Sequence, residues 1–357
     1  MANQYQNVTG TLHISGFFRT FMPIMRRLAL LILLATVLPS CIRKVDLDAE
    51  ILDGEEDAVC WMERLADDTP LRALSIPGAH DAASSSITAW PSWTRTQEKD
   101  IAGLWNCGVR AFDLRPALVD GELGIFHDKY SAHVTLPQVM RALLLALDRH
   151  PGEGAIIIIR HEQEADGNAP GWKDAMGSYL GSIRSRLVDY RPDLTLGELR
   201  GKVLVLSRDE YSGGPLGGYI RNWSSGGELS AQTGASVVDA EGETSPLWVQ
   251  DYYHPEGMDD KWAAVAGLFD AMESAGDTCP LVINHASGYL GSLPDYRGNA
   301  RNINIQATRH ILSRRAPAGI VMMDFAGVNR TRGVYVGGDV LVQALIEKNR
   351  VYLLSEN

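Results

Sequence analysis

Cysteine, basic charge and repetition are all scarce in this sequence. Four cysteines in 357 residues are too few for a disulfide scaffold, and neither the spacing nor the neighbours of Cys60, Cys107 and Cys279 suggest a metal site. At most two of these three can pair, so we interpret them as structural. The 33 basic residues are outnumbered by 44 acidic ones, and the net charge of -11 disfavours a nucleic-acid partner, because phosphate binding needs a basic excess. With a hydrophobic fraction of 45% and no repeat, the composition indicates an ordinary globular protein.

Long apolar runs are also missing, apart from one near the N-terminus. Residues 28–38 (LALLILLATVL) are apolar but too short to span a bilayer comfortably, two arginines precede them, and small residues lead into Cys41. This pattern predicts a signal peptide over residues 1–41, with Met25 as a candidate start. LPSC resembles a bacterial lipoprotein box, so we expect an exported protein that is either anchored through a lipid on Cys41 or secreted. A single membrane anchor is the alternative.

Alternating strand and helix patterns follow an acidic tether and first helix over residues 42–70, with the helix around Ala58–Ala66. Eight short β-branched or aliphatic runs recur, separated by amphipathic helical patterns. Strands this apolar predict a parallel sheet buried on both faces, and eight of them predict a closed barrel. The connection between residues 109–115 and 123–127 is too short for a crossover helix. We therefore expect an irregular TIM-type (β/α)8 barrel, a single α/β domain over residues 71–357.

Ionisable side chains follow nearly every one of these runs. In a parallel barrel the carboxyl ends of the strands share one rim, where barrel enzymes hold their active sites. Residues two apart on a strand face the same side, so Asp113 and Arg115 point the same way. One charge alone could merely solvate a strand end, but agreement among seven strands indicates a shared site. The candidates at this rim are His80, Asp81, Asp113, Arg115, His127, Asp128, Arg160, Glu162, Arg208, Asp209, Asp251, Tyr253, Asn284, His285 and Asp324.

The residue types at this rim predict acid-base chemistry on an anionic substrate. Arginine binds phosphate through paired hydrogen bonds, and histidine gives and takes protons near neutral pH. With two histidines, one can remove a proton while the other returns one, and a carboxylate such as Asp324 or Asp81 fixes the tautomer of a ring. We therefore predict phosphodiester cleavage that needs no metal. A calcium or dinuclear site on the same side chains is the alternative, which Arg115 disfavours by occupying the place of a cation.

Several of the runs are also specific motifs. IPGAHD, FDLRPALVDGELGIFHD, HPGEGAIIIIRHE, GKVLVLSR, WVQDYY, LVINHAS and GIVMMDF occur in this order. Together they resemble the bacterial phosphatidylinositol-specific phospholipases C, from about Leu71 to about Gln343. The resemblance implies the family's irregular TIM barrel. It also implies cleavage of phosphatidylinositol to diacylglycerol and inositol 1,2-cyclic phosphate without a cofactor.

The resemblance further implies a role for each matching residue. His80 is the general base that deprotonates the inositol 2-hydroxyl, with Asp324 orienting it. His127, paired with Asp81, is the general acid that protonates the departing diacylglycerol oxygen, and Arg115 stabilises the nonbridging phosphate oxygens. The remaining implied residues are Asp113, which supports the arginine, and the inositol-binding set Arg160, Glu162, Arg208, Asp251 and Tyr253.

Two positions depart from the family's pattern. Arg160 stands where lysine is frequent, and Asp128 follows the acid histidine where glycine is familiar. The first departure changes the donors offered to the inositol ring, because arginine presents a planar fork and lysine a single ammonium. The second puts a negative charge beside an anionic phosphate.

A lipid substrate also requires contact with a membrane surface. Trp90 and Trp93 follow the first strand end, and indoles suit insertion at such a surface, although they could equally pack in a satellite core. We expect a monomer whose partner is phosphatidylinositol in a membrane. The alternatives are a phosphodiesterase acting on glycosyl-phosphatidylinositol or glycerophosphoinositol, and a non-catalytic surface lipoprotein that binds inositol headgroups. Both candidate histidines are present, which disfavours the last alternative.

Overall fold

The computed structural model describes four stretches of the chain, residues 56–88, 94–224, 234–291 and 294–353. All of them belong to one structural unit, Asp46–Asn357. The expected signal peptide with Cys41, and the two tryptophans Trp90 and Trp93, lie outside the described residues. Within these four stretches, no helix is both long and apolar enough to cross a membrane.

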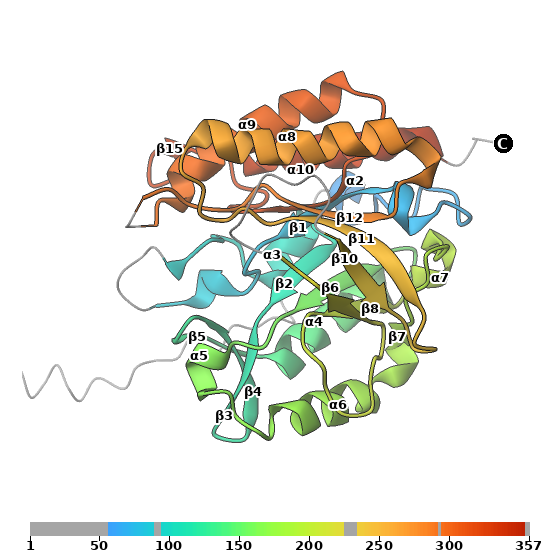
Figure 1. The fold of residues 1–357 in the computed structure, drawn as a ribbon, viewed down its shortest axis with the longest axis vertical. Helices are drawn as coiled ribbons and strands as arrows, with labels where there is room; N and C mark the ends of the chain where they lie inside the picture. Colours follow the sequence, from blue (N-terminus) through green and yellow to red (C-terminus); the bar gives the residue numbers. More distant parts are fainter. Residues whose placement is uncertain (1–55, 89–93, 225–233, 292–293, 354–357) are drawn as a thin grey trace, which may run out of the picture. The chain divides into compact units, whose positions relative to one another are not determined.

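Nine strands close into a barrel at the centre of this unit (Figure 1). In ring order they are β6 (Ala155–Ile159), β2 (Ala111–Leu114), β1 (Ser75–Ala79), β13 (Gly319–Met323), β12 (Leu281–His285), β11 (Thr244–Gln250), β10 (Ala235–Val238), β9 (Gly218–Arg221) and β8 (Val203–Ser207), and β8 pairs with β6 to close the ring. A short strand, β7 (Leu187–Val188), adds to β8. Every pairing in the ring is parallel except those of β10, which runs antiparallel to β9 and β11. The predicted irregular TIM-type barrel is therefore confirmed.

Helices cover the outside of the barrel, and α8, α9 and α10 lie side by side along one part of it (Figure 1). Their bounds are α2 (Glu56–Val59), α3 (Ile101–Asn106), α4 (Leu136–Arg149), α5 (Gln163–Asp166), α6 (Trp172–Ser182), α7 (Leu196–Leu199), α8 (Met258–Ala275), α9 (Tyr296–Ser313) and α10 (Gly338–Lys348). Local sequence sets where α4 begins, because Thr135 and Gln138 form a reciprocal capping box. The predicted helix around Ala58–Ala66 is wrong in extent, since α2 ends at Val59 and turns follow it.

Strand β6 shows why the barrel needs apolar residues at successive positions. Ile156 and Ile158 pack in one hydrophobic cluster, inside the ring of strands. Ile157 and Ile159, which alternate with them, belong to a second cluster shared with the helices. All four are at most 2% exposed. Both faces of the strand are thus buried, as the run of isoleucines predicts.

The prediction that residues 123–127 form a barrel strand is wrong. They belong to β4 (Glu122–His127), which forms a separate antiparallel sheet with β3 (Pro116–Val119) and β5 (Tyr130–Thr135). Asp120 and Gly121 join β3 to β4 with φ angles of 52° and 81°, the left-handed conformation that a two-residue Asp-Gly hairpin requires. The eighth strand running in the common direction is instead β9, which the sequence pattern did not predict. A further small hairpin is formed by β14 (Arg330–Thr331) and β15 (Val334–Tyr335).

A buried ion pair lies at the amino-terminal end of the strands, where Arg110 precedes β2 and Glu153 precedes β6. Both side chains are fully buried, and Arg110 Nε lies 2.8 Å from Glu153 Oε2. The guanidinium also donates to the carbonyl oxygens of Trp105 and Val109 and lies over the Trp105 ring. The other oxygen of Glu153 accepts a hydrogen bond from the Glu63 amide at 2.8 Å. The pair therefore ties α3 and the segment after α2 to the base of the barrel.

No disulfide joins the three cysteines of the described chain. Cys279 is buried, and Cys60 and Cys107 are half-buried. Burial raises the pKa of Cys279 to about 11, so this thiol stays uncharged at neutral pH. These features agree with the structural interpretation of the three residues.

Candidate active site

A cavity of about 510 Å³ opens at the carboxyl ends of the barrel strands. This is the end at which the strand-end pattern predicts a shared site. Asp81 and Asp324 lie in contact with His80. The other residues with an assigned role line the cavity itself: His80, Asp113, Arg115, His127, Arg160, Glu162, Arg208, Asp251 and Tyr253. Of the further rim candidates, Asp128 and His285 also line this cavity, whereas Asp209 and Asn284 do not.

His80 follows strand β1 and is held through one ring nitrogen. Its Nδ1 lies 2.8 Å from Oδ1 of Asp324, a fully buried carboxylate that follows β13. The second oxygen of Asp324 accepts a hydrogen bond from the Gly288 amide at 3.1 Å. Gly288 has a φ of 151°, and a Cβ there would lie 2.7 Å from the carbonyl oxygen of Tyr253, so only glycine fits. With both oxygens of Asp324 engaged, Nδ1 of His80 carries a hydrogen and Nε2 faces the cavity.

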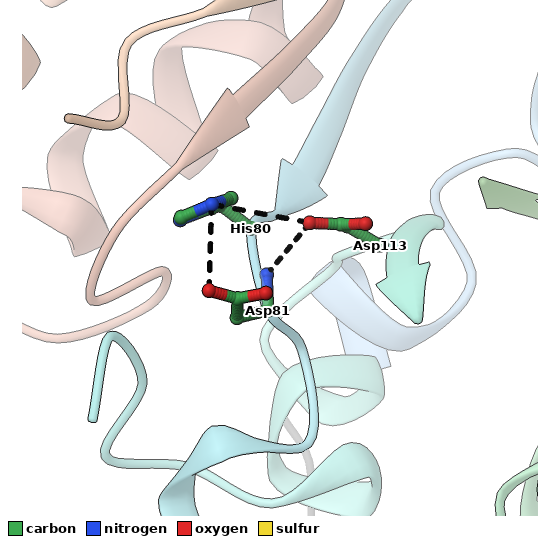
Figure 2. A group of neighbouring side chains, drawn as sticks. All are labelled: His80, Asp81 and Asp113. Carbon is green, nitrogen blue, oxygen red and sulfur yellow. Dashed lines mark hydrogen bonds and ion pairs between the residues drawn. The ribbon is translucent and has the colours of Figure 1, made fainter. Parts of the chain in front are cut away.

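Asp81 lies between the two candidate histidines. Its φ is 43°, a left-handed conformation that is uncommon for aspartate, and its amide donates to Asp113 Oδ2 at 3.1 Å. This bend places Oδ2 of Asp81 3.4 Å from Nε2 of His80 and 3.5 Å from Nε2 of His127. Figure 2 shows the resulting triangle of His80, Asp81 and Asp113. One carboxylate thus faces both imidazoles.

Arg115 joins the same cluster from the end of β2. Its Nε lies 2.7 Å from Asp81 Oδ1, and its Nη2 lies 3.3 Å from Asp113 Oδ2. Nη2 also lies 2.9 Å from Nε2 of His80. Because a guanidinium only donates, this contact requires an unprotonated Nε2. The contact therefore belongs to the unprotonated ring, the form that can accept a proton, and a protonated ring cannot keep it.

The surrounding charges make His80 strongly basic. Burial alone would lower the pKa of His80, but the carboxylates of Asp81 and Asp324 outweigh burial and the opposing charge of Arg115, and raise it to about 9. Burial would likewise raise the pKa of Asp81, yet the charges of Arg115 and of the two histidines hold it well below its usual range. Asp81 is therefore an anion at neutral pH.

His127 reaches the cavity from β4, outside the barrel. Its Nδ1 lies 2.8 Å from the carbonyl oxygen of Thr94, an acceptor only, so Nδ1 carries a hydrogen. Nε2 therefore faces Asp81 and the cavity, and a second proton on the ring would sit there. The ring packs edge to face with Tyr296 at a centroid distance of 6.3 Å. His80 and His127 thus present the same atom, Nε2, from two different sheets.

The opposite wall of the cavity carries the residues that the resemblance assigns to the inositol ring. Arg160 and Glu162 follow β6, Arg208 follows β8, and Asp251 and Tyr253 follow β11. Burial raises the pKa of Glu162 to about 8 against the opposing charge of Arg115. At neutral pH the wall therefore offers two cations, one protonated carboxyl group and one carboxylate as hydrogen-bonding partners.

Trp223 and His285 orient Asp251, and neither was assigned a role from sequence. Trp223 Nε1 donates to Asp251 Oδ2 at 2.9 Å, and His285 Nδ1 lies 3.7 Å from Oδ1. Burial lowers the pKa of His285 to about 4, which keeps this ring neutral. His285 ends strand β12, so the strand-end pattern contains it, whereas Trp223 lies in a connection that no sequence pattern marks. The cavity is completed by Tyr289 and Tyr296, also from connections or helix starts.

A buried polar network supports this wall from behind. Lys261 of α8 is fully buried, and its Nζ donates to the carbonyl oxygen of Tyr252 at 2.9 Å and to Gln250 Oε1 at 3.4 Å. Gln250 in turn donates to Asn284 Oδ1 at 2.8 Å. Burial lowers the pKa of Lys261 to about 8. The network fixes the ends of β11 and β12, and hence Asp251, and no sequence pattern distinguishes this lysine from an exposed one.

The described residues contain one cluster that could hold a metal ion, formed by His80, Asp81 and Asp113, whose ligand atoms lie within 4.8 Å of one another. Arg115 contacts all three of these side chains at distances of 2.7 to 3.3 Å. A cation bound there would have to displace the guanidinium from each of them. The donor set therefore fits an arginine better than a divalent cation.

Comparison with known proteins agrees with this geometry. No family model matches the chain. The 1-phosphatidylinositol phosphodiesterase of Staphylococcus aureus (strain Newman) is 24% identical over 315 residues, covering 81% of this chain and 94% of that protein. The Listeria monocytogenes protein of the same name is 29% identical over 167 residues, covering 42% of this chain and 48% of that one. A solved structure of phosphatidylinositol-specific phospholipase C from Staphylococcus aureus matches with a TM-score of 0.67 at 20% identity, covering 80% of this chain and 97% of that one. By sequence along most of its length and by fold, the chain is a homologue of the bacterial phosphatidylinositol-specific phospholipases C.

Proposed function

We propose that this protein is a phosphoric diester lyase that cleaves phosphatidylinositol to diacylglycerol and inositol 1,2-cyclic phosphate. The observation that carries the proposal is the placement of Asp81 between two imidazole Nε2 atoms, with Arg115 bound to Asp81 and to the Nε2 of His80. Two proton-transfer groups and one cationic oxyanion binder thus line one cavity, as an internal displacement at phosphorus requires. The names of the relatives supply the lipid, phosphatidylinositol.

In the proposed first half of the reaction, the phosphodiester attracts the Arg115 guanidinium through its nonbridging oxygens. This frees Nε2 of His80, which takes the proton of the inositol 2-hydroxyl as that oxygen forms its bond to phosphorus. The Nδ1 hydrogen bond to Asp324 stabilises the imidazolium that results. Asp324 therefore orients the base and balances its new charge without taking the proton itself.

In the second half, the bond between phosphorus and the diacylglycerol oxygen breaks. The protonated Nε2 of His127 gives its proton to the departing oxygen, and Asp81, 3.5 Å away, stabilises the charged ring before the transfer. The products are a neutral diacylglycerol and a cyclic phosphate that keeps one negative charge. One proton is taken by His80 and one is given by His127, so the reaction balances without an added reactant.

We further propose that the reaction needs no metal, which Arg115 supports by contacting every potential ligand of the cluster around His80. Phosphorus NMR on detergent-dispersed phosphatidylinositol should show the cyclic phosphate resonance forming at the same rate in EDTA and in calcium. A product that appears only after calcium is added would contradict this proposal. A resonance of the acyclic phosphate from the start would instead contradict the cyclic product.

The pH dependence of kcat/KM should report the pKa of the general base. Because His80 must be unprotonated and its pKa in the free protein is raised to about 9, kcat/KM should rise with pH toward about 9. Asp324→Asn removes a charge and a hydrogen bond that both raise this pKa, so the rising limb should move to lower pH. Asp148→Asn, at an exposed carboxylate in a surface ion pair, is the matched control and should leave the limb in place. If the rising limb of kcat/KM against pH is unchanged in Asp324→Asn, His80 is not the titrating base.

A further inference from the structure

A second cavity, of about 380 Å³, adjoins the first and has no role in the reaction described above. Arg160, Arg208 and Trp223 line both cavities, so they form the wall between them. Arg221 and Asn222 line only the second one. Three arginines therefore surround a space just beyond the residues proposed to bind the inositol ring.

Two of these guanidiniums make no close ion pair with the described residues: neither Arg160 nor Arg208 has a carboxylate within ion-pair distance. Arg208 instead lies over the Trp223 ring at 4.3 Å. Burial and the nearby charge of Arg160 lower the pKa of Arg208, and the charge of Asp251 opposes them from a longer distance. A neutral inositol ring supplies hydroxyl groups to this pair but no balancing charge.

The third arginine, Arg221, is held in place by residues that do not line the second cavity. Arg221 ends β9, pairs with Glu210 and lies over the Tyr219 ring at 5.3 Å. Asp209, the acidic residue of the cavity, already accepts a hydrogen bond from the His161 amide at 2.7 Å. The cavity thus presents an excess of positive charge and guanidinium donors, the arrangement that binds phosphate groups through paired hydrogen bonds.

We propose, on the basis of the function proposed above, that the second cavity binds a phosphate monoester carried by the inositol ring. Because Arg160 and Arg208 line both cavities, a ring held between them presents its far substituents to the second one. A dianionic phosphate there neutralises the two unpaired guanidiniums and reaches Arg221. The substrate class of this protein therefore includes phosphatidylinositol monophosphates as well as phosphatidylinositol.

The test compares kcat/KM on phosphatidylinositol with kcat/KM on the 3-, 4- and 5-monophosphates in the same detergent micelles. At least one monophosphate should be cleaved at least as efficiently as phosphatidylinositol. Arg221→Gln should lower kcat/KM on that monophosphate about tenfold, the size of one lost charge-assisted contact, and change the value on phosphatidylinositol less than about twofold. Arg191→Gln is the matched control, because Arg191 also pairs with a glutamate but lines neither cavity, and it should alter neither value.

The outcomes separate this inference from the proposed function. Two results would overturn the proposed role of the second cavity and leave the proposed function intact. One is cleavage of phosphatidylinositol with no cleavage of any monophosphate, and the other is an equal effect of Arg221→Gln on both lipids. Inhibition of phosphatidylinositol cleavage by inorganic phosphate as strong as that by soluble inositol bisphosphates would make the cavity a simple anion site and overturn its role in headgroup binding. If neither lipid is cleaved, the proposed function fails. Calorimetric binding of glycerophosphoinositol monophosphates to wild type and Arg221→Gln then decides the inference alone, with an unchanged affinity overturning it.

Discussion

His80→Ala is expected to lower kcat on phosphatidylinositol by roughly 10³- to 10⁴-fold, with KM almost unchanged. In the proposed mechanism the residue acts in the transition state, because its Nε2 takes the proton only as the 2-hydroxyl oxygen approaches phosphorus. The cavity wall proposed to bind the headgroup is built by other strand ends, so substrate affinity should survive. His133→Ala, which removes an exposed histidine from β5, is the matched control and should retain full activity.

A change of leaving group separates the roles of the two histidines. An inositol aryl phosphate releases a phenolate that leaves without a proton, so it has little need of a general acid. His127→Ala should therefore lose much less activity on this substrate than on phosphatidylinositol, whereas His80→Ala should lose a similar amount on both. Equal losses for His127→Ala on the two substrates would rule out its role as the acid. If His80→Ala instead loses much less activity on the aryl substrate than on phosphatidylinositol, the assignment of acid and base is reversed.

Glu153→Ala is expected to reduce the free energy of unfolding by about 3–5 kcal/mol, because it leaves the Arg110 charge buried without a partner. The melting temperature should fall by roughly 2–4 °C for each kcal/mol. Glu153→Gln keeps an acceptor for the Glu63 amide and removes only the charge, so it should show most of the same loss and provides a milder variant if the alanine protein does not fold. Chemical denaturation followed by circular dichroism measures both.

The control for this second expectation is Asp148→Ala. Asp148 pairs with Arg186 at 2.8 Å, but the two side chains are 57% and 32% exposed. Exposed pairs contribute little, so the loss should be under about 1 kcal/mol. If the two substitutions cost the same, the ion pair at the base of the barrel is not the anchor that its burial indicates.

The sequence was most informative where the barrel itself imposes order. Parallel strands end at one rim, so polar residues that follow apolar runs, such as His80 and Asp324, are brought together by the fold with no local signal needed. The same logic failed for residues 123–127, because the Asp120-Gly121 turn makes a hairpin before a barrel strand can form. His127 was nevertheless identified, by the strand-end pattern and by the resemblance, although its strand lies outside the barrel.

Other parts of the site follow from tertiary packing and leave no pattern in the sequence. Trp223 acts on Asp251 from a connection between strands, and Lys261 acts from a helix whose alternation of polar and apolar residues looks unremarkable. Gly288 is an exception in hindsight, since a glycine three residues beyond a polar strand end can mark a close backbone approach. The second cavity depends on β9, a strand that the sequence pattern did not predict.

In the proposed mechanism, the division of the two histidines between a barrel strand and an outlying sheet makes the two proton transfers separable in evolution and in engineering. His80 and its carboxylate are fixed by the barrel, which every substitution must preserve. His127 is carried by three short strands attached beside it, so sequence drift or grafting in that appendage can alter which alcohols depart while the attack on phosphorus is conserved. Homologues with this scaffold should therefore differ mainly in the leaving group that they accept. The step that forms the cyclic phosphate should be the same in all of them.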